Sequence, residues 1–419
     1  MSTTEPAGGP TFLKPAAIPR GWAAALAFLV LVGVVGMIVG LATDPVRAWQ
    51  AYLATFLFFA GFGAGGVLFA RAIEMSSGRW GRPVKRIAEA LGAFLPATFI
   101  LFLILIPGLP RILPWVKTPY GPRGYLNLPF LVLRDAGALL FMLVLGLYLL
   151  AQSLRVDLGY ANERGGAFTG PVHRFLTRNW RGTDAEVPRA RRRLAVASPL
   201  FAAAYAWLYS MLAVDLIMSL NRDWYSTLIG GYYFVGCFYV TLAVVLVAVF
   251  WTRRRFGLED QIRPNHLVDV ANLAMSFGIM TAYFFFAQLL IIWYGNIPRE
   301  TSFLVHRTWT TPWGPVAVAV IVLSYLVPLL AILNRSWKTK AWTMTLFAAL
   351  VSTGVWLSRN LEVAPAITGG RRVTIGPLEV SVFLGFLGLL GLSFLVFIHR
   401  VPPIVLRDPV LDAPPEDER

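Results

Sequence analysis

The sequence predicts an all-α integral membrane protein with about ten transmembrane helices. Of its 419 residues, 57% are hydrophobic and only 14% are charged, whereas soluble domains carry about a quarter charged residues. Apolar runs of about 20 residues, the length that a helix needs to cross a hydrocarbon core of about 30 Å, recur along the chain. The basic residues concentrate in short segments between these runs, as membrane insertion requires.

Ten apolar runs account for the predicted helices, near 22–43, 49–73, 86–106, 130–152, 195–219, 228–252, 267–293, 314–334, 341–358 and 379–398. The first run is too long for a signal-peptide core and no small-residue cleavage site follows it, so we expect it to be retained. We expect a short N-terminal segment (1–21), a membrane domain (22–398) and an acidic C-terminal tail (399–419), in which the part after Arg407 is expected to be disordered. Helices 2–5 (about 49–219) and 6–9 (about 228–358) are expected to form two four-helix groups, flanked by helices 1 and 10.

The distribution of Lys and Arg predicts the orientation in the membrane. One set of alternate loops, with both ends of the chain, holds 26 of these residues, and the other set holds 11. The richer side is expected to be cytoplasmic. We therefore expect a protein of the bacterial inner membrane with both termini on the cytoplasmic side. The Arg155–Arg193 loop alone holds nine arginines, which we interpret as stop-transfer charge rather than a specific lipid or partner site. The net charge of +15 therefore indicates contact with membrane lipid and no nucleic-acid binding.

The cysteine and histidine content argues against a metal centre in this chain. Cys237 is the single cysteine, which excludes a disulfide, a thiolate iron–sulfur cluster and a haem-c attachment motif. None of the four histidines lies in the middle of an apolar run, so a bis-histidine haem within the bundle is not expected.

A glycine-rich stretch in the second run matches the dinucleotide fingerprint G-x-G-x-x-G at Gly61, Gly63 and Gly66. The match lies inside an apolar helix, with no preceding strand and no βαβ unit, so it predicts no nucleotide site. Gly61 and Gly65 are four residues apart, which would let the backbone of a neighbouring helix approach closely.

Ionisable residues within the helices separate by depth, and those near the outer side are Arg134, Asp135, Asp215 and Arg359. An acid near the bilayer centre costs about 2.5–3.5 kcal/mol on insertion scales, so such residues usually face a cavity or a partner. A quinol loses two protons when it is oxidised, which carboxylates could accept, while an arginine could polarise a quinone oxygen. The outer set therefore fits a quinone-headgroup site, and the alternative is structural ion pairing near the interface.

The inner set could form a proton half-channel, and it comprises Glu74, Glu89, His266, Asp269, Asn272, Ser276 and Tyr283. The last four residues recur at helical spacing, so we expect them to share one face of the seventh helix and to point inward. Glu74 and Glu89 lie on adjacent helices joined by a short loop and could meet that face. The alternative is that these acids simply reach water at the headgroups.

Several motifs resemble those of the NrfD-like family, the membrane subunits of polysulfide-reductase type, and within it the ActF subunits of alternative complex III. The resemblance spans about residues 45–335. It is carried by Ala60–Gly66, Arg86–Ala90, Pro96, Tyr125–Phe130, Asp215–Leu220, Trp224–Thr227, Gly236-Cys237, Gln288, Trp293–Pro298 and Glu300-Thr301.

The resemblance implies a subunit of a quinol-oxidising respiratory complex, built as two four-helix bundles. It implies no covalently bound cofactor in this chain, with a quinone (menaquinone or similar) as the ligand. Haem and iron–sulfur clusters would reside in periplasmic partner subunits, beside a paralogous NrfD-like membrane subunit. Asp135, Asp215 and Arg359 match charged positions of the family's quinol pocket, at the outer face of helices 2–5.

One departure from the family leaves two roles open for this chain. The quinol-oxidising paralogue also places a histidine in the pocket, and this chain has no histidine in helices 2–5. The chain either binds quinone itself or serves as a scaffold and proton path. A secondary transporter is the alternative class, which predicts inverted repeats and helices broken at mid-membrane. Pro96 is the nearest such feature, and we expect no counterpart at the corresponding place in the second half.

Overall fold

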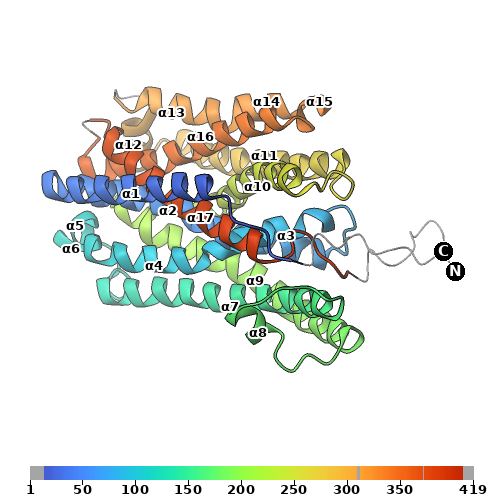
Figure 1. Ribbon diagram of the computed structural model, residues 1–419. Coiled ribbons are helices and arrows are strands. Elements are labelled where there is room, and N and C mark those ends of the chain that lie inside the picture. The colour runs from blue at the N-terminus through green and yellow to red at the C-terminus, as the bar shows by residue number, and fades with distance from the viewer. Residues whose placement is uncertain (1–13, 309–311, 371, 409–419) are drawn as a thin grey trace.

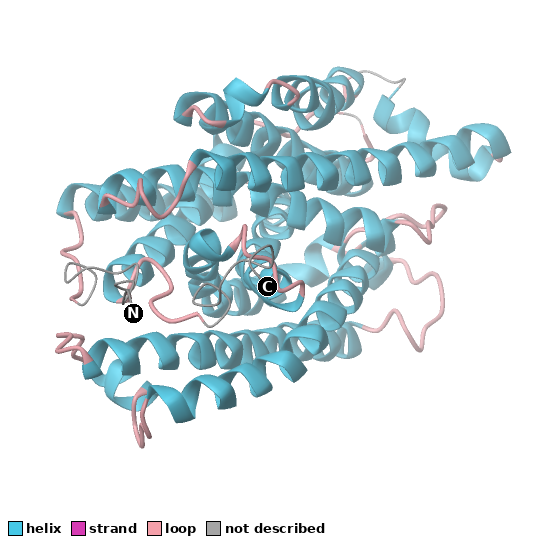
Figure 2. Cartoon of the chain, turned by 90° about the vertical axis from the view of Figure 1, so that its right-hand side faces the viewer, coloured by secondary structure: helices cyan, strands magenta, loops and turns pink. Residues whose placement is uncertain are grey.

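The computed structural model describes residues 14–308, 312–370 and 372–408. This part of the chain consists of helices and loops without strands (Figure 2). It contains ten helices long and apolar enough to cross a membrane. The predicted fold class and number of spans are therefore confirmed.

Seven spans are single α-helices: α1 (Arg20–Thr43), α2 (Pro45–Met75), α7 (Leu128–Glu163), α10 (Ile229–Phe256), α11 (Pro264–Gly295), α16 (Ala341–Thr368) and α17 (Pro377–Arg400). Three are interrupted: α3–α4–α5 (Arg82–Leu91, Leu95–Leu105, Leu109–Ile112), α9 (Thr183–Leu216, then a 3₁₀ turn Met218–Leu220) and α13–α14 (Gly314–Ile321, Val327–Ile332). The connections carry the short helices α6 (Pro114–Lys117), α8 (Pro171–Leu176), α12 (Pro298–Thr308) and α15 (Arg335–Lys338).

Prolines explain two of the interruptions, because proline has no N–H to donate to the carbonyl four residues earlier. Pro96 follows a 3₁₀ turn at Gly92–Phe94, between α3 and α4. Pro328 follows a π-helical turn at Val322–Leu326, between α13 and α14. The carbonyl of Ser324 accepts a hydrogen bond from the Tyr239 hydroxyl at 3.0 Å instead, so the break is satisfied within the bundle.

The spans run side by side, with α5, α6 and α12 at one end and α3 and α15 at the other (Figure 1). We call the first the outer end and the second the inner end, following the orientation expected from the charges. In one group α7 packs on α4 and α9, and α2 packs on α3, α4 and α9. In the other, α10 and α16 pack together and contact α11, α13 and α14. Helix α1 packs mainly on α17.

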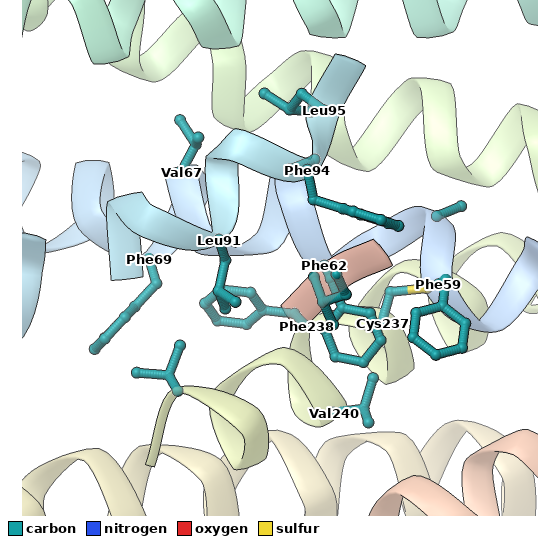
Figure 3. Close-up of a cluster of buried hydrophobic side chains, with 14 of the residues drawn as sticks. Phe59, Phe62, Val67, Phe69, Leu91, Phe94, Leu95, Cys237, Phe238 and Val240 are labelled. Carbon is teal, nitrogen blue, oxygen red and sulfur yellow. The ribbon is translucent and has the colours of Figure 1, made fainter. Parts of the chain in front are cut away.

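Helix α2 is the centre of the molecule, because 94% of its most apolar stretch is buried against both groups. Phe59 and Phe62 of α2 lie among Leu91 and Phe94 of the third span and Phe238 of α10 (Figure 3).

The glycines of α2 let α10 approach closely. A Cβ on Gly61 would lie 2.5 Å from the Cβ of Cys237, and one on Gly65 would lie 2.6 Å from Oγ1 of Thr241. Both neighbours belong to α10, so the packing role predicted for this glycine pair is confirmed.

Candidate functional site

The outer acids Asp135 and Asp215 come from α7 and α9, which pack against each other. Both carboxyl groups are fully buried and interact electrostatically with each other. The structure therefore brings together two of the four residues predicted for the outer site, on one wall of the first helix group.

Arg134 joins this acid pair. Its Nε donates a hydrogen bond to Oδ2 of Asp215 at 2.7 Å. The guanidinium carbon lies 4.0 Å from the centre of the Tyr125 ring and 4.7 Å from that of Phe130, within the range of cation–π attraction. We call Tyr125, Arg134, Asp135 and Asp215 the outer cluster.

Several buried polar atoms of the outer cluster have no hydrogen-bond partner within the part of the chain that the structure describes. With both acids ionised, Nη1 and Nη2 of Arg134, both carboxyl oxygens of Asp135 and Oδ1 of Asp215 are buried without a hydrogen-bond partner. A proton on one of the two acids would let Asp135 and Asp215 hydrogen-bond to each other. An unsatisfied buried donor or acceptor costs about 1–3 kcal/mol, and native structures contain few of them. Five in one place mark a site where polar atoms from outside the chain, water or a ligand, would complete the hydrogen bonding.

Tyr125 contributes a half-buried phenol to the cluster, from the loop before α7. Burial and the neighbouring Asp215 carboxylate raise its pKa to about 12, against a smaller opposing effect of Arg134. The hydroxyl therefore keeps its proton at neutral pH and can donate a hydrogen bond. Sequence reasoning used Tyr125 only within a family motif and did not assign it to the site.

Arg359, the fourth residue predicted for the outer site, lies in a different cluster. It is buried in α16, donates to Oε2 of Glu362 at 2.8 Å and lies over the rings of Tyr232 and Tyr233. Oε1 of Glu362 accepts from Ser358 at 2.9 Å, and the Ser358 hydroxyl lies 2.8 Å from that of Tyr232. This polar group belongs to the second helix group, so the structure separates Arg359 from Asp135 and Asp215.

The inner acids Glu74 and Glu89 lie in a buried network of ion pairs. Arg71 of α2 donates to both, at 2.6 Å in the case of Glu74. Lys85 also pairs with Glu74, and Arg86 also pairs with Glu89. The structure therefore brings the two predicted acids together through Arg71.

Asp157 of α7 extends this network to the chain after α17. One of its oxygens accepts from Arg86, and the other accepts from the backbone N–H groups of Leu406 and Arg407 at 3.1 and 3.3 Å. Arg82 pairs with Asp408. Residues 401–408 are thereby held across the inner end of the first helix group.

The prediction that the polar face of α11 points inward is wrong. Asn272 and Ser276 are exposed, and Tyr283 is 63% exposed. Helix α11 packs on α10 through small and apolar residues instead, among them Ala271, Ala274 and Gly278, so its polar face is left on the surface. Small side chains let two helix backbones pack closely. The face of α11 that carries them therefore faces α10, and the polar face remains on the surface.

The remaining inner residues bond locally on that exposed side. Nδ1 of His266 accepts from the backbone N–H of Arg263 at 3.0 Å, and Oδ1 of Asn272 accepts from Nζ of Lys338 at 2.5 Å. Asp269 is half-buried beside His266. Helix α11 has its main contacts with α10, α12 and α14, so this face does not join the network of Glu74 and Glu89.

Sequence reasoning missed Asp157, Lys85 and the pairing roles of Arg71 and Arg86. A signal was available for the two arginines, since each precedes a glutamate by three residues, on the same helical face. Asp157 gave no such signal, because it lies near the arginine-rich loop that resembles ordinary stop-transfer charge.

A scan against protein-family models and a search of curated proteins both find no match to this chain. Membership of the NrfD-like family stays a prediction that rests on the motifs themselves.

Proposed function

We propose that this chain is the membrane subunit of a quinol-oxidising respiratory complex and that the outer cluster binds the quinone headgroup. The observation that carries the proposal is the set of five buried polar atoms without partners on Arg134, Asp135 and Asp215. A quinone headgroup carries two oxygens, which can accept from the arginine or, in the quinol, donate to a carboxylate.

The chemistry of quinol oxidation matches these groups. Asp135 and Asp215 outnumber the one arginine between them, so the pair offers a carboxylate that can take up a proton from a quinol hydroxyl. Arg134 remains charged and polarises the quinone oxygen, while the Tyr125 phenol donates a further hydrogen bond. The electrons would pass to the haem and iron–sulfur subunits that the family resemblance implies.

Access from the membrane is consistent with this role. Phe130 and Leu133, which precede Arg134 in α7, are exposed at 45% and 71%. The Arg134 side chain is 11% exposed. A hydrophobic quinone in the bilayer would therefore contact apolar side chains first and then the guanidinium of Arg134. A movement of this side chain would let the headgroup enter the cluster.

The test is binding of a fluorescent hydroxyquinoline N-oxide, a quinone analogue, to the purified full chain in detergent. Asp215→Asn and Asp135→Asn are each expected to weaken binding about tenfold or more, because hydrogen bonds to charged groups contribute about 1.5–3 kcal/mol. Asp223→Asn is the matched control, since Asp223 is exposed at the same end outside the cluster. Wild-type affinity in both cluster variants would contradict the proposal and leave the chain as scaffold or proton path.

The scaffold and proton-path role is supported by the inner network. Glu74 lines a cavity at the inner end and pairs with Arg71, which also holds Glu89. Protons could enter from the cytoplasm through this cavity.

A secondary transporter is the candidate from a different class. The observation that favours it is the pair of interrupted spans, α3–α4 and α13–α14, since transporters often carry broken helices at mid-membrane. Purification from native membranes separates the two classes: polypeptides with haem absorbance would accompany a respiratory subunit, whereas a transporter would purify without them.

A further inference from the structure

A cavity of about 410 Å³ opens at the inner end of the first helix group. Its walls are the end of α2, the start of α3, the inner halves of α7 and α9, and the segment 405–408. The open side includes Arg191, Ala195 and Pro199 of α9, which are exposed, and Met75 of α2, which is 42% exposed. The cavity therefore reaches from the inner interface along α9 towards the apolar part of the bundle.

The lining is amphipathic along its length. The interface end is lined by the cationic side chains of Arg82, Lys85, Arg191 and Arg407, together with the carboxyl groups of Glu74, Asp157 and Asp408. Leu194, Ala195 and Pro199 continue the wall along α9 with apolar surface. A molecule that matches both parts has an anionic head and a hydrocarbon tail.

The basic side chains at the interface end have N–H groups that are not engaged in the ion pairs described above. Lys85 has three N–H donors and, among the residues that the structure describes, pairs with Glu74 alone. Arg82 pairs with Asp408, and its buried Nε has no hydrogen-bond partner within that part of the chain. The residue Arg82 is 95% buried, since 5% of its surface is exposed. The buried hydroxyl of Ser198, which also lines the cavity, likewise has no hydrogen-bond partner in the described part of the chain.

Arg191 differs from its neighbours in the basic cluster. Arg191, Arg192 and Arg193 are all exposed, but only Arg191 lines the cavity. Arg193 donates to Gln152 at 3.1 Å, and no ion pair of Arg191 is found among the described residues. One member of a run that resembles general stop-transfer charge is thus placed to bind a specific anion.

We propose that this cavity is a binding site for an anionic phospholipid of the inner leaflet. The phosphate lies among Lys85, Arg82 and Arg191, and an acyl chain follows Leu194, Ala195 and Pro199. Basic pockets between helices at the cytoplasmic side of membrane proteins bind anionic headgroups in this manner. The residues 405–408 form the floor of the site, so the bound lipid also stabilises the segment after α17.

The proposal is tested by native mass spectrometry of the full chain in detergent, titrated with dioleoylphosphatidylglycerol or dioleoylphosphatidylcholine. We expect one phosphatidylglycerol to bind more tightly than phosphatidylcholine. Arg191→Gln should weaken phosphatidylglycerol binding about fivefold, since a basic residue near a lipid headgroup contributes about 1 kcal/mol. Arg192→Gln is the matched control, with the same charge change one residue away, and should leave the affinity unchanged.

Two further arms distinguish a lipid from a free anion. Ala195→Trp places an indole in the space proposed for the acyl chain. It should reduce lipid binding while leaving every basic side chain in place. Inorganic phosphate at the concentration of the lipid should not displace it, because the phosphate lacks the acyl contact. Equal affinities of the Arg191→Gln and Arg192→Gln variants, equal binding of the two lipids, or displacement by inorganic phosphate would each overturn the proposal.

Discussion

Asp157 of α7 accepts a hydrogen bond from the guanidinium of Arg86 in the third span, and both side chains are buried. The same carboxylate accepts hydrogen bonds from the backbone N–H groups of Leu406 and Arg407. One side chain therefore links two spans and the segment that follows the last span.

Replacing Asp157 should therefore destabilise the inner end of the protein. Asp157→Asn leaves the buried charge of Arg86 with less compensation, and breaking one side of a buried ion pair typically costs about 3–5 kcal/mol. We expect a clearly lower midpoint of thermal unfolding in detergent. Asp184→Asn, the same substitution at an exposed position of α9, is the control and should leave the midpoint unchanged. A stable Asp157→Asn protein would show that Glu89 alone compensates Arg86.

Tyr125 should act as a hydrogen-bond donor across the physiological pH range. Its pKa is raised to about 12, so increasing the pH from 7 to 9 removes no proton from the phenol. Tyr125→Phe should weaken binding of the quinone analogue about two- to tenfold, the range expected for one hydrogen bond of about 0.5–1.5 kcal/mol. This loss should be the same at pH 7 and pH 9. Tyr294→Phe, at a site that is 86% exposed, is the control. A loss at pH 7 that disappears at pH 9 would show that the phenol ionises.

Asp269 should be dispensable for proton uptake. It lies beside the exposed polar face of α11 and apart from the network of Glu74 and Glu89. In vesicles containing the intact complex, Asp269→Asn should leave the proton-to-electron ratio unchanged. Glu74→Gln is the comparison, because Glu74 lines the inner cavity. A lower ratio in Asp269→Asn alone would restore α11 as the proton path.

The orientation of the chain can be read with reporter fusions. Because Lys and Arg divide 26 to 11 between the two sides, fusions after Arg193, Arg255 and Lys340 should report a cytoplasmic location. Fusions within 107–124 and 299–312 should report the opposite side. An outward signal from the Arg155–Arg193 loop would reverse the assignment.

The helices were predictable from the sequence because they depend on local composition. A run of about 20 apolar residues must form a helix in the membrane, since every backbone polar group has to be satisfied within the segment. The ten predicted runs all lie within observed spans or extend only slightly beyond them. The interruptions were less visible, since Pro96 and Pro328 mark a break without specifying a 3₁₀ or a π turn.

The sites were predictable only in part, because they depend on which helix faces meet. Arg134, Asp135 and Asp215 were predicted in one outer set, since ionisable residues in apolar runs need partners, and the structure places these three together. Arg359 was grouped with them by depth and by the family resemblance, and neither reveals which helix group a side chain enters. The polar face of α11 was placed inward because its polar residues recur at helical spacing, but it lies on the surface.

By itself the sequence determined the membrane class, the ten spans and the expected orientation, because each follows from the hydrophobicity and charge of short segments. Only the tertiary structure decided that Arg134 would bond to Asp215, that Arg359 would pair with Glu362, and that Asp157 would hold the chain beyond α17. The physical reason is that helix packing is selected by the shapes of small and large side chains across many contacts. Buried charges then pair with whichever partners that packing brings within reach.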